Sequence, residues 1–147
     1  MRGIKLALDT GCAYTLSTLL TGNKLIDAEH AELFRALEKL LEIAKSQSAD
    51  SEAFSEIFSR IGLDLARHID HEESLFLASD MPAADIDDHI RAHVRIMEEF
   101  SSLNLDLMQG KSIDNATVTL MARQWILNHV VKYDLKLRPF VADKPEP

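Results

Sequence analysis

Apolar residues recur along this chain at the three- and four-residue steps that place side chains on one face of an α-helix. Four such stripes cover 26–44, 54–75, 86–107 and 118–129. The fourth is rich in β-branched residues, which favour strands, but a strand in this part of the chain would have no partner. The pattern therefore predicts four long helices and an all-α protein.

Residues that typically start or end helices stand between these stripes. Asp50 is a candidate N-cap of the second helix, and Asp80 and Pro82 separate the second helix from the third. Gly110 is expected to end the third helix, and the fourth begins near Asp114. Because the links are short, consecutive helices are expected to run antiparallel.

These elements predict an antiparallel, up-down-up-down four-helix bundle with an N-terminal arm. Residues 25–138 would form the bundle, 1–24 the arm that packs against it, and 139–147 a frayed C-terminal tail. No internal repeat and no low-complexity tract interrupts this organisation.

Composition narrows the class of protein. The chain has 147 residues, of which 46% are hydrophobic, enough for a sizeable core. Its formal net charge is −8, and it has no run of Lys and Arg, which argues against nucleic acid as a partner. The single cysteine, Cys12, excludes an internal disulfide and a thiolate metal cage.

The chain also lacks the features of a membrane or secreted protein. No apolar stretch is long enough to span a bilayer, and Asp9 interrupts the N-terminal segment that would otherwise resemble a secretory signal. With an acidic surface and no evident exposed apolar stripe, we expect a cytoplasmic monomer that does not bind membranes.

Side chains that bind metals occupy the apolar stripes of all four predicted helices. They are His30, His68, Glu72, His89, His93 and His129. Burying such groups is costly unless each finds a partner, so the set requires either an extensive hydrogen-bond network or a metal. His68 and Glu72 are four residues apart, as are His89 and His93, which places both members of each pair on one helix face.

Asp134 is a candidate second carboxylate. It follows His129 by five residues, off the helical stripe, so it could reach the centre only from the flank or through a local distortion near the helix end. His71 also lies off the stripe, and we expect it to be solvated or to support a ligand from outside. A lone histidine on an apolar face is more often a core residue, but matched histidines on four helices indicate a metal site.

The donor set favours two metal ions over one. Five imidazoles and two carboxylates are too many for one tetrahedral zinc ion, which takes four ligands. Nitrogen and oxygen donors without thiolate suit iron, manganese or zinc. The Glu-x-x-His motif of carboxylate-rich diiron enzymes is absent from the sequence, and fewer anionic ligands favour binding oxygen over using it to break strong bonds. A site that holds only zinc remains an alternative.

The segments around these candidates resemble the signatures of the hemerythrin family, in particular its bacterial single-domain members and sensor modules. Residues 26–34 are similar to the first-helix signature, and 68–73 resemble the His-x-x-x-Glu-Glu segment of the second helix. The histidine pair within 89–93 resembles that of the third helix, and 125–134 is similar to the last signature.

Three positions depart from the family pattern. Glu29 stands where glutamine is common, Ile69 where phenylalanine is usual, and Phe76 where methionine is common. The last two departures are expected to change the shape of the pocket beside the metal centre.

The resemblance implies two iron ions joined by an oxo or hydroxo bridge. One iron would be held by His89, His93 and His129, and the other by His30 and His68. Glu72 and Asp134 would bridge the two ions, and the second iron would keep an open position for dioxygen. The walls of the oxygen pocket would be Ile69, Trp125, Ile126 and Val130.

By the same resemblance, the expected function is reversible binding of dioxygen for storage, delivery or detoxification. A dry pocket would limit the loss of superoxide or peroxide. One alternative is an oxygen or redox sensing module that acts through the N-terminal arm or a signalling partner. A further alternative is a diiron enzyme that reduces peroxide or nitric oxide.

Overall fold

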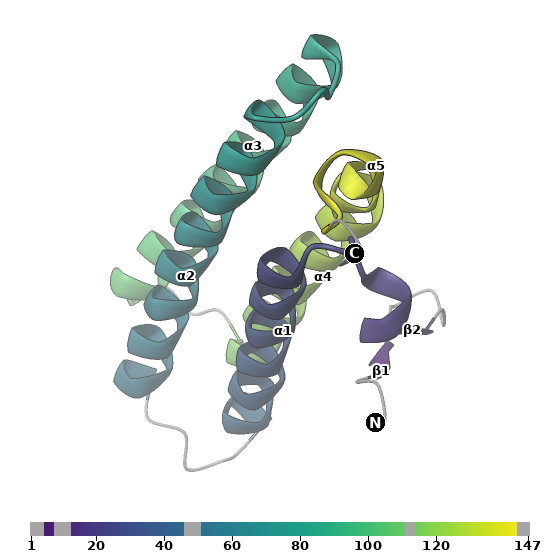
Figure 1. The fold of residues 1–147 in the computed structure, drawn as a ribbon. Helices are drawn as coiled ribbons and strands as arrows, with labels where there is room; N and C mark the ends of the chain where they lie inside the picture. The colour runs from purple at the N-terminus through teal and green to yellow at the C-terminus, as the bar shows by residue number, and fades with distance from the viewer. Residues whose placement is uncertain (1–4, 8–12, 46–50, 111–113, 144–147) are drawn as a thin grey trace.

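Four long helices account for most of the computed structural model, which describes residues 5–7, 13–45, 51–110 and 114–143 (Figure 1). They are α1 (Lys24–Lys45), α2 (Ser51–Leu77), α3 (Ala83–Met108) and α4 (Asn115–Lys132). Each helix contacts its neighbours in sequence, and α1 also contacts α4, so the four helices close around one interior. The predicted all-α, antiparallel four-helix bundle is confirmed.

Several helix boundaries lie at the residues that the sequence singled out. Gly110 follows α3 with a φ of +71°, a left-handed conformation that favours glycine. The Asp114 carboxylate accepts a hydrogen bond from the backbone N–H of Thr117 at 3.1 Å and so caps α4. Pro82 directly precedes the first residue of α3. Asp50, the candidate cap of α2, lies outside the described residues.

Helix α4 forms despite its β-branched residues because packing stabilises it. Val118, Ile126 and Val130 are almost completely buried in the bundle interior. Burying one such side chain contributes about 1.5–3 kcal/mol, whereas its lower helix propensity costs only about 0.5 kcal/mol. Tertiary packing therefore outweighs the local preference for a strand.

The apolar core is divided into a larger and a smaller cluster. In the larger cluster the Phe58 and Phe100 rings stack with centroids 4.4 Å apart. A Cβ atom at Gly62 would lie 3.1 Å from the Phe100 ring, so this position suits glycine. The smaller cluster includes Ile26 at the start of α1 and Phe76 near the end of α2. The buried residues His30 on α1 and Glu72 on α2 lie between these two clusters along their helices.

The N-terminal arm contains a short hairpin that the sequence pattern did not predict. Strands β1 (Lys5–Ala7) and β2 (Ala13–Thr15) pair antiparallel, and the 3-10 helix η1 (Leu16–Leu19) follows them. Leu19 at the end of η1 is buried against the larger core cluster. The arm therefore reaches the bundle, as expected, through at least this side chain.

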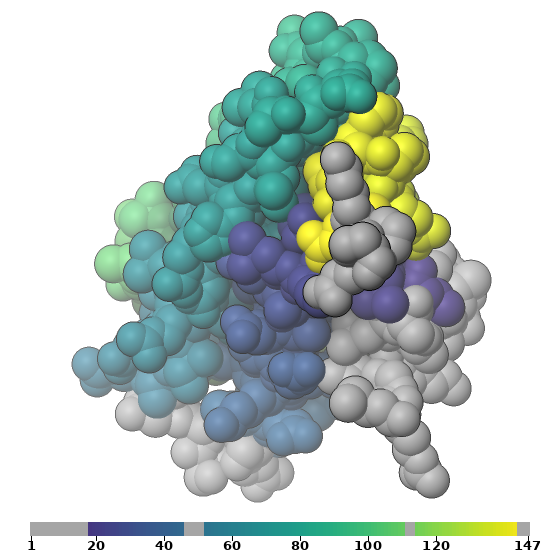
Figure 2. Space-filling view, viewed as in Figure 1, coloured from purple at the N-terminus to yellow at the C-terminus, as the bar shows by residue number. Residues whose placement is uncertain are grey.

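The C-terminal segment folds back onto the start of α1. After α4 the chain forms η2 (Asp134–Leu137) and α5 (Arg138–Val141). Figure 2 shows this yellow segment beside the dark purple residues around the start of α1, where the Asn23 side chain donates a hydrogen bond to the carbonyl of Val141 at 2.9 Å. Val141 is buried, so the described part of the expected tail packs against the bundle. No described helix is both long and apolar enough to cross a membrane.

Candidate metal centre

All seven residues predicted as ligands meet inside the bundle. One comes from α1, two each from α2 and α3, and one each from α4 and η2. In chain order they are His30, His68, Glu72, His89, His93, His129 and Asp134. His129 is the most exposed of them, with 11% of its side chain accessible, and the others are buried.

Asp134 joins the centre because the helix geometry changes just before it. Helix α4 ends at Lys132, and Asp134 begins the tighter turn of η2. This change swings the Asp134 carboxylate toward the interior, where it is 1% exposed. The distortion that the five-residue spacing required is therefore present.

Glu72 faces two separate groups of histidines with its two oxygens. Its Oε1 lies 2.8 Å from Nε2 of His89 and 3.0 Å from Nε2 of His93. Its Oε2 lies 3.1 Å from Nε2 of His68 and 3.8 Å from Nε2 of His30. One carboxylate thus spans the imidazoles of α3 on one side and those of α1 and α2 on the other.

The two carboxylate oxygens of Asp134 also lie near different groups of imidazoles. Oδ1 lies 2.9 Å from Nε2 of His89 and 3.0 Å from Nε2 of His129, while Oδ2 lies 2.9 Å from Nε2 of His30. The cluster therefore has two subsites. We call the one with three imidazoles the three-histidine subsite and the one formed by His30 and His68 the two-histidine subsite. Both carboxylates offer an oxygen to each subsite.

Several of these buried atoms have no hydrogen-bond partner among the described residues. The set includes Nε2 of His30, His89 and His129, with Glu72 Oε2 and Asp134 Oδ1. Their separations are short, but the atoms point at shared space instead of at one another. Two neighbouring ligands that each lie about 2.1 Å from one ion in an octahedral arrangement are about 3.0 Å apart. The residues therefore fit two cations that share both carboxylates.

The electrostatics of both carboxylates favour nearby positive charge. Burial and the neighbouring Asp134 would raise the pKa of Glu72, but the nearby imidazoles of His68, His89 and His93 outweigh both effects and lower it to about 2. Burial likewise acts to raise the pKa of Asp134, but the nearby imidazole of His129 outweighs burial and holds this pKa well below its usual range. Both groups stay ionised at neutral pH.

The pKa values of two of the histidines, His68 and His89, are raised. Burial lowers the pKa of His68, but the nearby carboxylate of Glu72 outweighs burial and raises this pKa to about 9. Burial also lowers the pKa of His89, and the nearby carboxylates of Asp134 and Glu72 raise it to about 9. Protons on these imidazoles can balance the buried carboxylates, and metal cations can do so in their place.

Comparison with known proteins agrees with this geometry. The chain matches the family model described as the hemerythrin HHE cation binding domain over residues 21–141. It belongs to the hemerythrin family. Proteins named bacteriohemerythrin from Campylobacter jejuni serotypes O:6 and O:2 are each 22% identical to it over 131 residues, which cover 89% of this chain and 96% of the relative. No solved structure gives a significant match.

Two further carboxylates support the cluster of this hemerythrin domain from outside. Nδ1 of His68 lies 3.0 Å from Oε1 of Glu29, and Nδ1 of His93 lies 2.7 Å from Oε2 of Glu73. Such bonds hold the proton on Nδ1, which leaves Nε2 free to bind a metal. Sequence reasoning assigned neither glutamate this role, although each directly adjoins a predicted ligand, and that adjacency is the signal that could have indicated it.

His71 combines the two properties expected of it. Its side chain is 41% exposed, and its Nδ1 lies 2.7 Å from Oε2 of Glu29, the same carboxylate that contacts His68. It therefore touches the cluster only through Glu29.

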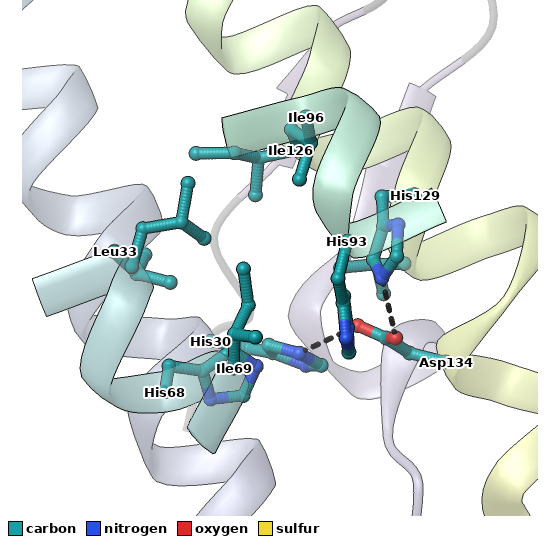
Figure 3. Close-up of a pocket in the computed structure, with 11 residues that line it drawn as sticks. His30, Leu33, His68, Ile69, His93, Ile96, Ile126, His129 and Asp134 are labelled. Atoms are coloured by element: carbon teal, nitrogen blue, oxygen red, sulfur yellow. Dashed lines mark ion pairs between the residues drawn. The ribbon is translucent and has the colours of Figure 1, made fainter. Parts of the chain in front are cut away.

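A small cavity lies beside the hemerythrin cluster (Figure 3). Three of the four predicted pocket residues line it, namely Ile69, Ile126 and Val130, and sequence reasoning missed Leu33, Leu65 and Ile96. The fourth predicted residue, Trp125, instead lines a groove on the outer side of α3 and α4. The dashed lines in Figure 3 join Asp134 to His30 and His129, which both border the cavity.

Proposed function

We propose that this chain binds dioxygen reversibly at a pair of iron ions held by the buried cluster. The observation that carries the proposal is the apolar cavity beside the cluster. The cavity is bordered by imidazoles of both subsites, namely His30, His68, His93 and His129. Its volume of about 10 Å³ is near the lower limit for holding one water-sized molecule. Its position supports a ligand site for a small, uncharged molecule.

The two subsites differ in the number of donors that they supply. Three imidazoles face one subsite and two face the other, while Glu72 and Asp134 serve both. The two-histidine subsite therefore has one donor fewer, and its two imidazoles both border the cavity. A pair of ferrous ions, when bound, supplies the two electrons that reversible binding of dioxygen requires.

The protein's own contribution is to hold the donors and exclude water. Glu29 and Glu73 fix the orientation of His68 and His93 through their Nδ1 atoms. Apolar side chains such as Ile69 form the rest of the cavity wall and offer no hydrogen bond to a departing anion. Because charged superoxide or peroxide would leave through apolar surroundings, this wall favours release of neutral dioxygen.

An oxygen titration tests the proposal directly. The purified protein is loaded with ferrous iron under argon, its visible spectrum is recorded, and oxygen is admitted and then removed. A visible charge-transfer band that appears with oxygen and disappears on its removal supports reversible binding. Iron that oxidises without such a band, or fails to bind, refutes the proposal and favours the enzymatic or zinc alternative.

A pair of histidine variants assigns the activity to the cluster. His93→Ala removes a donor of the three-histidine subsite and should abolish full iron loading and oxygen binding. His71→Ala is the matched control, because His71 is partly exposed and contacts the cluster only through Glu29. A His93→Ala protein that still carries two irons and binds oxygen normally would contradict the assigned site.

We also propose oxygen or redox sensing as a second function. Hydrogen bonds connect the C-terminal segment that follows Asp134 to the N-terminal arm and the start of the bundle. Asp134 and Arg138 belong to consecutive short helices, and the Arg138 guanidinium donates to the carbonyl of Leu20 at 3.1 Å through Nε. Gly22 and Asp143 are joined by a backbone hydrogen bond of 3.0 Å. Movement at Asp134 would therefore be transmitted to the arm.

Hydrogen exchange tests the sensing proposal. The backbone amides of the arm should differ in protection between the deoxygenated ferrous form and the oxygenated form. Arg138→Gln, which removes the charge and shortens the reach toward Leu20, should reduce that difference. Identical protection of the arm in the two forms rules out sensing by this route.

A further inference from the structure

A groove on the outer side of α3 and α4 reaches the metal cluster from solvent. Its volume is about 370 Å³, and the buried side chains of Ala92 and Ile96 form part of its lining. His129, the most exposed of the predicted ligands, also lines it. The groove is thus a place where an external molecule can contact the edge of a ligand imidazole.

Two aromatic side chains, Trp125 and Tyr133, contribute polarisable surface to the groove. Trp125 lies one helical turn before His129 on α4, and Tyr133 directly follows α4. The Tyr133 ring stacks on His129 with centroids 5.2 Å apart and an angle of 29° between the planes, and it lies 5.7 Å from the ring of His89. Tyr133 therefore connects the groove with two imidazoles of the three-histidine subsite.

The net formal charge of the groove has the opposite sign to that of the whole chain. Arg95 and Lys132 line it together with one acidic residue, Glu99, so its formal charge is positive while the whole chain carries −8. The Arg95 guanidinium donates to the Tyr133 hydroxyl at 3.0 Å, and the Lys132 ammonium lies 5.4 Å from the centre of the Tyr133 ring. Arg95 has further N–H groups with which it can bind an anion.

We propose that this groove binds a reduced flavin mononucleotide, which returns the oxidised iron pair to its ferrous state. A flavin has a planar ring that stacks on aromatic side chains and a phosphate that suits Arg and Lys. The groove volume falls in the range of roughly 300–1,000 Å³ that small-molecule sites occupy. This inference rests on the proposed function, because it assumes that an oxidised iron pair needs reduction.

The electron balance of the step is complete. Oxidation of one reduced flavin releases two electrons and two protons. The two electrons convert two ferric ions to two ferrous ions, and the protons pass to solvent. His129 itself lines the groove, so electrons from a flavin ring bound there can pass to the cluster through this imidazole.

Binding is tested first, on the 147-residue chain with its metals bound, by calorimetric titration with oxidised flavin mononucleotide. Riboflavin, which has the same ring and no phosphate, should bind at least tenfold more weakly. The double variant Arg95→Glu/Lys132→Glu should weaken binding of the mononucleotide at least tenfold. The matched control, Arg60→Glu/Arg67→Glu, changes the net charge equally at exposed positions on α2 and should leave binding within twofold.

Reduction is tested next, by mixing the ferric protein with photoreduced flavin mononucleotide under argon and following the loss of the ferric absorption. The Arg95→Glu/Lys132→Glu protein should react at least tenfold more slowly than the wild-type and control proteins. The inference is overturned if flavin does not bind, if both double variants weaken binding equally, or if the groove variant is reduced at the wild-type rate.

These outcomes are separable from failure of the proposed function. The calorimetric titration needs neither dioxygen nor a change of oxidation state, so flavin binding at the groove can be measured even if no reversible oxygen band forms. Conversely, reversible oxygen binding without any flavin binding would support the proposed function and refute the inference that the groove binds a flavin.

Discussion

Removing the Glu29 carboxylate should weaken metal binding in one half of the centre only. Glu29 Oε1 lies 3.0 Å from Nδ1 of His68, and the glutamate side chain is 16% exposed. This contact orients the imidazole so that Nε2 faces Oε2 of Glu72 at 3.1 Å. Glu29→Ala would leave the His68 ring without its outer partner, whereas the three-histidine subsite keeps its own partner at Glu73.

The expected magnitude follows from the type of hydrogen bond. A bond to a charged acceptor contributes about 1.5–3 kcal/mol, and the low exposure of Glu29 limits screening by solvent. Each 1.4 kcal/mol corresponds to about a tenfold change in affinity, so Glu29→Ala should weaken the two-histidine subsite about 10–100-fold. Glu29→Gln keeps an acceptor and loses the charge, so its effect should be about tenfold or less.

Calorimetric titration of the metal-free protein with ferrous iron under argon measures the binding of one iron ion at each of the two subsites as two binding steps. We expect one weakened step in Glu29→Ala and weakening of the other step in Glu73→Ala. Glu42→Ala provides the control, because Glu42 is an exposed glutamate on the same helix as Glu29. Equal weakening of both steps by Glu29→Ala, or an effect no larger than that of Glu42→Ala, would refute the reasoning.

Three further predictions concern pH, the cavity and the core. In the metal-free folded protein the pKa values of His68 and His89 are about 9, against an ordinary value of 6.5. Protonation of these imidazoles therefore stabilises the fold fully below pH 6.5, and this stabilisation is lost as the pH rises through 9. Tm should fall between these two pH values, and a constant Tm would contradict the prediction. Ile69→Trp should overfill the cavity and weaken oxygen binding about tenfold or more with both irons retained. Wild-type oxygen affinity in this variant would place the ligand elsewhere. Phe100→Ala should cost about 3–5 kcal/mol in denaturant unfolding, and the exposed Leu105→Ala less than about 0.5 kcal/mol; similar losses would argue against the core assignment.

The helices and the candidate ligands were predictable because both depend on spacing within one element. The four-residue step between His89 and His93 places both rings on one face of any helix, and their centroids are 4.5 Å apart in the structure. Gly110 and Asp114 act on the backbone next to them, so their roles also follow from local chemistry. For such features the order of residues is sufficient.

The hairpin of the arm and the lining of the cavity were harder to predict. Residues 5–7 and 13–15 show no alternation that separates a strand from other structures, and their pairing is known only once both segments are placed. Trp125 is on the same helix as Ile126, yet it lines the outer groove while Ile126 lines the cavity. A single step along a helix turns a side chain by about 100°, and the position of the neighbouring helix decides which of the two faces inward.

Helical spacing, which is a property of the chain alone, specifies which residue types gather in the interior. How the carboxylate oxygens and imidazoles are paired depends on the way the helices pack. Each oxygen of Glu72 and of Asp134 faces a different group of imidazoles, and Glu29 reaches His68 from another helix. These contacts depend on distances between helices and on the turn at Asp134, which no periodicity within a single helix contains.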